Sequence, residues 1–278
     1  MLKTRIVTAV LLLSAFFAAL FFLPPVGWVI FATVVATVAA WEWGALMRLN
    51  DSARVALGVV VAFVCLVLMV QVPAALGLEA GFPEAAWRFG RWFYCPAAAF
   101  WMLCVPLWMR QRWLLPRSIL GVAVGLVLIL PTWLALVQLK QAGGLSLIAI
   151  MATVWLADIA AYFFGRTFGR HKLAPSISPG KTWEGALGGG LAVVVYGFVL
   201  APKLPEALAG NLALLLIVLI LLTAVSVIGD LFESLLKRQA GLKDSSSILP
   251  GHGGVLDRID SLTSTLPLVA LVWLTGLH

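Results

Sequence analysis

Long apolar segments separated by short polar ones make up most of the chain. A helix needs about 20 apolar residues to cross a bilayer, and runs bounded by charged residues, Pro or Gly give about nine segments close to that length. These segments are residues 6–22, 26–47, 55–72, 94–109, 119–139, 145–164, 185–200, 212–229 and 259–277. The pattern predicts an all-α polytopic integral membrane protein with about nine transmembrane helices. We interpret the first segment as an uncleaved anchor, because it leads directly into further apolar segments.

The composition agrees with a membrane protein and excludes the soluble classes. Of the 278 residues, 62% are hydrophobic and 11% are charged, and the mean hydropathy is +1.05. A soluble chain has about 45–50% apolar and about 25% charged residues. A domain of roughly 300 residues also buries only about 75% of the surface that its unfolded chain exposes. A soluble enzyme, a secreted domain and a disordered tail are therefore excluded.

The distribution of basic residues predicts the orientation. With a cytoplasmic N-terminus, all of the 19 Lys and Arg residues fall on the cytoplasmic side except Arg88, Arg91, Lys140 and Lys203. Such an asymmetry follows the positive-inside rule. We therefore expect a cytoplasmic N-terminus, and the net charge of +7 implies no nucleic-acid partner.

Acidic residues concentrate in the second half of the chain. We therefore divide the chain into residues 1–140, a set of transmembrane helices with a structural role, and residues 141–278, a transmembrane region that is expected to carry the chemistry. The second region contains two cytoplasmic loops, expected at residues 165–183 and at about 231–258. The chemistry is expected there, facing the cytoplasm.

Four aspartates near the predicted ends of apolar segments are candidates for that chemistry. An ionisable side chain inside a membrane segment costs about 2.5–3.5 kcal/mol and therefore indicates function by default. Asp158 lies inside the sixth segment, where a structural hydrogen bond is the alternative, and Asp230 ends the eighth. Asp257 and Asp260 share the first turn of the last segment, where the helix dipole alone favours acids. Glu233 and Lys237 have the spacing of an ordinary helical ion pair.

The glycine-rich sequence 251–254 precedes Asp257 and suggests phosphate binding. Consecutive glycines allow backbone N–H groups to converge on an anion. Carboxylates suit Mg²⁺, which normally takes one or two of them together with substrate phosphates. His252 has no neighbours at zinc spacing, so we reject a zinc site. Together these residues predict a site for a metal–polyphosphate complex.

Basic residues of the two loops are candidates for holding the phosphates, although topology alone explains basic residues on this side. Gly180-Lys181-Thr182 resembles the end of a Walker A loop, but Pro175 and Pro179 exclude a phosphate cradle. The sequence leaves open whether this loop presents Ser178, Lys181 and Thr182 to an anion.

The sequence from Ser234 to Asp260 resembles the signature of the phosphatidate cytidylyltransferases. The matching positions are Ser234, Lys237-Arg238, Lys243-Asp244, Ser246, Leu249-Pro250, His252-Gly253-Gly254, Asp257-Arg258 and Asp260. The segments around Asp158 to Arg166 and Ile177 to Gly185 are also similar to this family. The resemblance covers about residues 158–261.

The resemblance implies a Mg²⁺-dependent membrane enzyme that transfers cytidylyl from CTP to phosphatidate in the bilayer, in contact with membrane lipids. It also implies a homodimer, with residues 1–140 expected to serve dimer formation and lipid access and residues 141–278 to be the catalytic region, and it associates K⁺ with the site. The expected catalytic residues are Asp230, Asp257, Lys243 and Asp260, of which Asp230 and Asp257 are the expected metal ligands. The expected substrate-binding residues are Ser178, Lys181, Lys237, Arg238, His252, Gly253, Gly254 and Arg258.

Two other functions stay open. A CTP-dependent polyprenol kinase would transfer the γ-phosphate instead, and an ion-coupled transporter would use buried acids to bind its coupling ions. The expected location is the bacterial inner membrane, with the site facing the cytoplasm.

Overall fold

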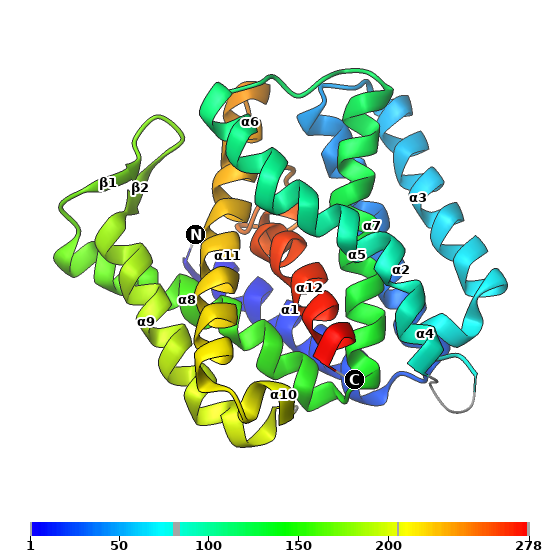
Figure 1. The fold of residues 1–278 in the computed structure, drawn as a ribbon. Coiled ribbons are helices and arrows are strands. Elements are labelled where there is room, and N and C mark those ends of the chain that lie inside the picture. The colour runs from blue at the N-terminus through cyan, green and yellow to red at the C-terminus, as the bar shows by residue number, and fades with distance from the viewer. Residues whose placement is uncertain (1, 80–83, 205, 277–278) are drawn as a thin grey trace.

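The chain folds into a bundle of long helices with one small hairpin at its side (Figure 1). The computed structural model describes residues 2–79, 84–204 and 206–276. The helices of the first half are α1 (Leu2–Phe22), α2 (Pro25–Leu46), α3 (Asp51–Gln71), α4 (Glu84–Phe89), α5 (Arg91–Ala99), α6 (Val105–Gln111) and α7 (Ile119–Gln141). Those of the second half are α8 (Gly144–Phe168), α9 (Trp183–Leu200), α10 (Glu206–Ala209), α11 (Leu212–Ala240) and α12 (Leu256–Gly276). Short 3-10 turns lie at Pro73–Leu76 and Ala201–Lys203.

Within the described residues, eight helices are long and apolar enough to cross a membrane. They correspond to the first eight predicted segments. The fourth of them, Arg91–Gln111, combines α5 and α6 through the π-helical turn Phe100–Cys104. The ninth predicted segment forms α12, a helix of 21 residues with Asp257 in its first turn. The all-α polytopic class is confirmed, and the count of nine and the cytoplasmic N-terminus stay predictions.

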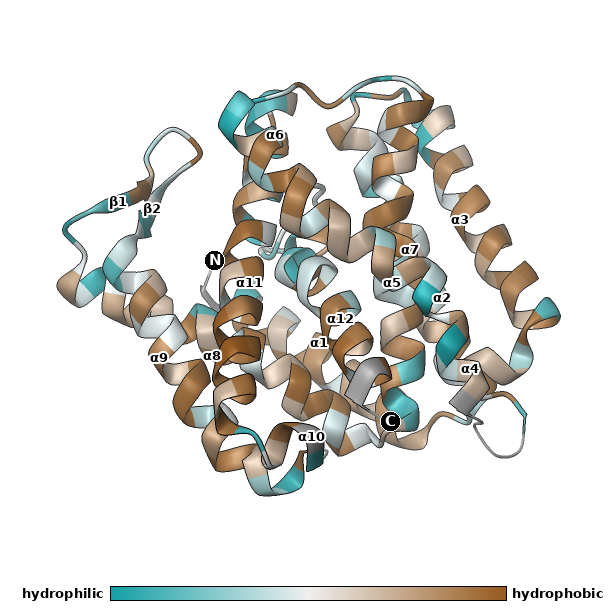
Figure 2. Cartoon of the chain, viewed as in Figure 1, coloured by the Kyte–Doolittle hydropathy of each residue, from teal (hydrophilic) through white to brown (hydrophobic). Residues whose placement is uncertain are grey.

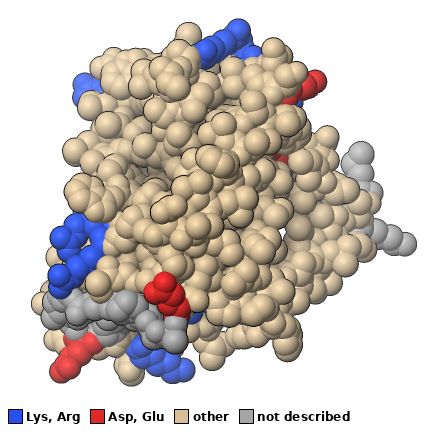
Figure 3. All heavy atoms as spheres, turned by 90° about the vertical axis from the view of Figure 1, so that its right-hand side faces the viewer, with Lys and Arg blue, Asp and Glu red and all other residues tan. Residues whose placement is uncertain are grey.

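The surface of the bundle suits a bilayer. Apolar residues cover the outward faces of the helices (Figure 2), and Phe22, Leu187 and Val199 are more than two-thirds exposed. On the face shown in Figure 3, charged side chains gather towards the two ends of the molecule. An apolar belt between polar ends is the arrangement that a hydrocarbon core requires.

Helix α11 continues well past residue 229, where the sequence pattern predicts its end. Leu231, Phe232, Leu235 and Leu236 are buried, so an apolar face persists although charged residues enter the other face. Phe232 packs edge-on against the ring of Trp101. The helix ends at Ala240, because Gly241 adopts a left-handed conformation. The second loop is therefore residues 241–255, shorter than predicted, and Asp230 lies inside the helix.

The first predicted loop contains an antiparallel hairpin of strands β1 (Lys172–Ala174) and β2 (Ser178–Thr182), which projects from the helical body (Figure 1). Pro175 follows β1 and suits a tight turn, in which the Ile177 N–H donates to the Ala174 carbonyl. The Thr182 side chain then caps α9 by accepting from the N–H of Gly185. The hairpin places Lys181 next to α11.

Candidate active site

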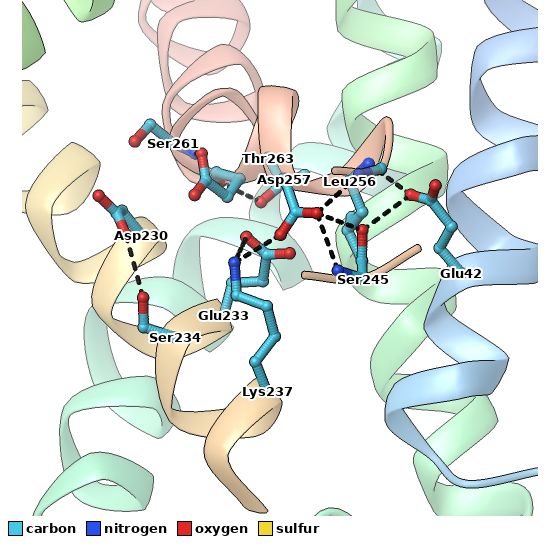
Figure 4. A network of polar contacts seen from close by, with 12 residues as sticks. Glu42, Asp230, Glu233, Ser234, Lys237, Ser245, Leu256, Asp257, Ser261 and Thr263 are labelled. Atoms are coloured by element: carbon cyan, nitrogen blue, oxygen red, sulfur yellow. Dashed lines mark hydrogen bonds and ion pairs between the residues drawn. The ribbon is translucent and has the colours of Figure 1, made fainter. Parts of the chain in front are cut away.

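The most buried ion pair of the site joins α11 to the start of α12. Lys237 Nζ lies 2.6 Å from Asp257 Oδ1, and their side chains are only 12% and 3% exposed. Asp257 Oδ2 accepts hydrogen bonds from the N–H of Ser245 and the N–H of Gly254, each at 2.8 Å (Figure 4). Removing one partner of a buried pair costs about 3–5 kcal/mol. The Asp257 carboxylate is therefore held rigidly in place.

A second carboxylate lies against the same lysine. Glu233 Oε2 is 3.4 Å from Lys237 Nζ, so the helical pair expected from the sequence forms, but it is longer than the contact to Asp257. Both carboxylate oxygens of Glu233 are buried. Asp260 lies near enough to interact electrostatically with Glu233 and Asp230. Several acids thus share one buried cation.

Asp230 is paired with Lys181 of the hairpin. Lys181 Nζ lies 2.5 Å from Asp230 Oδ2, and both side chains are about a quarter exposed. The Ser234 hydroxyl donates to Asp230 Oδ1 at 3.2 Å. Asp158 of α8 interacts electrostatically with both members of the pair. Asp158, which the sequence marked by its depth in an apolar segment, therefore borders the site.

Glu42 of α2 is a site residue that the sequence analysis missed. Its side chain is completely buried and accepts from the backbone N–H groups of Val255, at 2.9 Å, and Leu256, at 2.6 Å. The Ser246 hydroxyl also donates to it, at 2.6 Å. The carboxylate thus satisfies N–H groups at the start of α12 that have no acceptor within the helix. Its signal in the sequence was a single carboxylate inside the apolar segment 26–47.

Ser245 lies between Glu42 and Asp257 (Figure 4). Its hydroxyl oxygen is 2.8 Å from Asp257 Oδ2 and 3.2 Å from Glu42 Oε2. A hydroxyl carries one proton, so it donates to only one carboxylate at a time. The loop 241–255 is consequently fixed from both sides, by one acid of α2 and one of α12.

The packing around this loop requires glycine at two positions, independently of any role in ligand binding. Gly253 has φ +82°, and an added Cβ there would lie 2.6 Å from Asp257 Oδ2. An added Cβ at Gly254 would collide with Ser245 and Glu42. The sequence predicts that the Gly254 amide binds phosphate, but in the structure this N–H donates to Asp257. A phosphate contact from Gly254 would require that bond to break.

The remaining predicted residues lie around this cluster. Ser178 and His252 are partly buried, and within the described residues His252 Nδ1 has no hydrogen-bond partner. Lys243, Arg238 and Arg258 are exposed, and in the described ranges their side chains form no ion pair. The structure thus brings Lys181, Lys237 and the acids together and leaves these other basic residues free at the surface.

The acids fit a hard divalent cation. Across the described ranges, no three His, Cys, Asp or Glu side chains stand close enough together to hold a metal on their own. Mg²⁺ does not need such a group, since it normally combines one or two carboxylates with waters and substrate phosphates. Glu233 interacts electrostatically with Asp257 and Asp260, and such a group of acids also favours an additional positive charge nearby.

The fold and site define a polytopic membrane protein in which buried carboxylates pair with lysines of α11 and the hairpin. Residues 3–275 match the sequence model of the cytidylyltransferase family. The chain therefore belongs to the cytidylyltransferase family and is a membrane-embedded nucleotidyltransferase. This confirms the resemblance noted in the sequence at the level of the family.

Similar proteins cover almost the whole chain. The phosphatidate cytidylyltransferase of Pseudomonas aeruginosa is 40% identical over 284 residues, which cover 99% of this chain and 98% of the relative. That of Haemophilus influenzae is 34% identical, with 96% of each chain covered. That of Brucella suis is 49% identical over 134 residues, about half of each chain.

Proposed function

We propose that this protein transfers the cytidylyl group of CTP to phosphatidate and releases pyrophosphate, leaving CDP-diacylglycerol for phospholipid biosynthesis. The observation that carries the proposal is the pair of lysine–carboxylate contacts, Lys237–Asp257 and Lys181–Asp230, inside a membrane bundle. The near full-length similarity to enzymes named phosphatidate cytidylyltransferase supports it.

The reaction needs charge neutralisation more than a base. A phosphate monoester has its second pKa near about 6, so the phosphatidate oxygen is already ionised at neutral pH. This oxygen forms a bond to the α-phosphorus of CTP while the bond to the β-phosphate oxygen breaks. Two polyanions must therefore meet, and Lys237 and Lys181 supply positive charge where they do so.

The carboxylates hold their lysines ready for this task. Asp257 and Glu233 keep Lys237 extended and charged in a buried position, and Asp230 draws the hairpin lysine Lys181 onto α11. Positioned charges of this kind act without reorganisation during the reaction. We also assign Lys243, Arg238, Arg258 and His252 to substrate phosphates, together with Ser178 and the Gly253 amide.

Mg²⁺ is the metal we propose for the site, with Asp230 and Asp257 as its protein ligands. When bound, it would polarise the phosphates and stabilise the leaving pyrophosphate. Asp260 supports these acids from the next turn of α12. K⁺ is proposed as an additional ion, without assigned ligands.

We place the protein in a bacterial inner membrane as a homodimer with its site facing the cytoplasm. The bacterial origin of the relatives and the excess of basic residues on the predicted cytoplasmic side support this. We retain residues 141–278 as the catalytic region and residues 1–140 as the supporting one, with Glu42 contributed by the latter.

Labelled CTP tests the proposal with purified protein, phosphatidate and Mg²⁺. We expect label from the α-phosphate to enter the lipid and label from the γ-phosphate to leave as pyrophosphate. Entry of the γ-label into a lipid would establish the polyprenol kinase alternative. Ion-coupled uptake of a solute by proteoliposomes that contain the protein, without any CTP turnover, would establish the transporter alternative. Either result would overturn the proposal.

A further inference from the structure

A large, partly open apolar cavity lies between α8, α9, α11 and α12, towards the helix ends near Leu145 and Lys203. It has a volume of about 370 Å³, within the range of small-molecule sites, which are about 300–1,000 Å³. Its walls include Ile150, Leu219, Val269 and Trp273, and Lys203 stands at its rim. The catalytic acids are not among its walls, so the cavity is separate from the site described above.

A second void lies between this cavity and the site. It is much smaller, about 10 Å³, and shares Ile150 and Leu222 with the large cavity. Its other walls include Ala157, which precedes Asp158, and Ser226, which lies one helical turn before Asp230. The small cavity therefore lies on the side of the large one that faces the acids, although the acids do not line it.

The large cavity lies within reach of an acyl chain from the acids. At a rise of about 1.5 Å per residue, Leu222, on the cavity wall, lies about 12 Å along α11 from Asp230. One leaflet of the hydrocarbon core spans roughly 15 Å, which is the length that lipid acyl chains fill. A lipid whose phosphate reaches Asp230 can therefore extend an acyl chain as far as the large cavity.

We propose that the large cavity binds the distal part of one acyl chain of the lipid substrate and of its product. This inference rests on the proposed function, since it takes the lipid phosphate to bind at Asp230 and Lys181. An acyl chain is already in an apolar medium in the bilayer, so the cavity contributes packing and shape and no hydrophobic driving force. It consequently acts as a measure of chain length.

The test fills the cavity with a larger side chain. Ala149 lines it, and Ala149→Phe adds an aromatic ring there. Ala213→Phe is the matched control, because Ala213 is exposed on the same bundle and does not line the cavity. CDP-diacylglycerol formation is measured for the full-length protein in detergent micelles with dioctanoyl and dioleoyl phosphatidate.

We expect Ala149→Phe to lower the rate with the dioleoyl substrate about tenfold relative to the rate with the dioctanoyl substrate. An effect of this size is typical of overpacking, here of the added ring against the acyl chain. Ala213→Phe should keep the wild-type ratio. If Ala149→Phe still forms product and its ratio of dioleoyl to dioctanoyl rates is unchanged, the inference is overturned. Absence of product from any phosphatidate with the wild-type protein overturns the proposed function instead.

A photoreactive group at the end of an acyl chain provides a second test if Ala149→Phe fails to fold or loses all activity. With wild-type protein and diazirine-tagged phosphatidate, we expect cross-links on α11 between Leu215 and Leu222. Excess untagged phosphatidate should suppress them, and diacylglycerol without a phosphate should not. Cross-links that phosphatidate does not suppress would identify a bound structural lipid, anchored for example at Lys203, and would overturn the inference.

Discussion

The carboxylate of Glu42 in α2 accepts a hydrogen bond from the backbone N–H of Leu256, the first residue of α12, at 2.6 Å. The two residues are more than two hundred positions apart in the sequence. This contact fixes the start of the helix that carries Asp257, and so it transmits the packing of the first half of the bundle to the predicted active site.

Replacing Glu42 by Gln should lower both stability and activity. One carboxylate oxygen becomes an NH₂ group that faces backbone N–H donors, and each unsatisfied buried group costs about 1–3 kcal/mol. We expect a lower thermal unfolding midpoint in detergent and a loss of kcat that exceeds the change in KM. Glu79→Gln, at an exposed glutamate, is the control and should leave both unchanged. Wild-type stability in Glu42→Gln would contradict the role of this residue.

Lys237→Met should destabilise the protein and abolish turnover, because it leaves Asp257 and Glu233 buried without their cation. Removal of one partner of such a pair costs about 3–5 kcal/mol. The double variant Lys237→Met/Asp257→Asn should recover part of the lost stability, as measured by thermal unfolding, and none of the activity. Arg110→Met, at an exposed position of α6, is the control. Recovery of turnover in the double variant would remove Asp257 from the catalytic assignment.

Asp230→Asn should separate activity from stability. The Lys181–Asp230 pair is partly exposed, and such pairs contribute about 0–1 kcal/mol, so unfolding should change little. Turnover of CTP should nevertheless fall at least about a hundredfold, because a proposed metal ligand and the anchor of Lys181 are lost together. Asp51→Asn, which breaks an exposed pair with Arg54, serves as the control. Near-normal rates in Asp230→Asn would refute its role as a ligand.

Gly254→Ala should displace the loop 241–255 by sterics alone. The added Cβ would collide with Ser245 and Glu42, both of which are held by hydrogen bonds and cannot move freely. We expect strongly reduced activity together with faster proteolysis of the loop in detergent. At Gly190 of α9 an added Cβ would lie 3.6 Å from Thr223, an ordinary contact. Gly190→Ala should therefore preserve activity, and equal behaviour of the two variants would contradict this account.

The sequence predicted the helices well because the bilayer imposes a length and a composition on each of them. It placed the end of α11 too early, since Asp230, Glu233 and Lys237 suggest a loop when read in order. In the folded chain they occupy one face, and Phe232 and its apolar neighbours bury the other. Only the packed structure distinguishes a charged loop from a helix with one charged face.

The residue types of the site were also visible in the sequence, but their partners were not. Asp257 was assigned from its neighbours along the chain, and its contact with Lys237 depends on how α11 and α12 meet. Glu42 went unnoticed because a single carboxylate in an apolar segment does not reveal which loop it will contact. The hairpin that delivers Lys181 was expected only as a loop, since a short turn between two prolines gives little periodicity.

The Glu42 contact also bears on how this enzyme can be divided. A fragment beginning at residue 141 would retain every acid and lysine that we assign to the substrates, yet the amides of Val255 and Leu256 would lose their acceptor. The catalytic groups that we propose thus lie in the second half of the chain, and part of the scaffold that orders them lies in the first half. Neither portion is a self-sufficient module, and a split or grafted version of this protein would have to carry the α2 segment along.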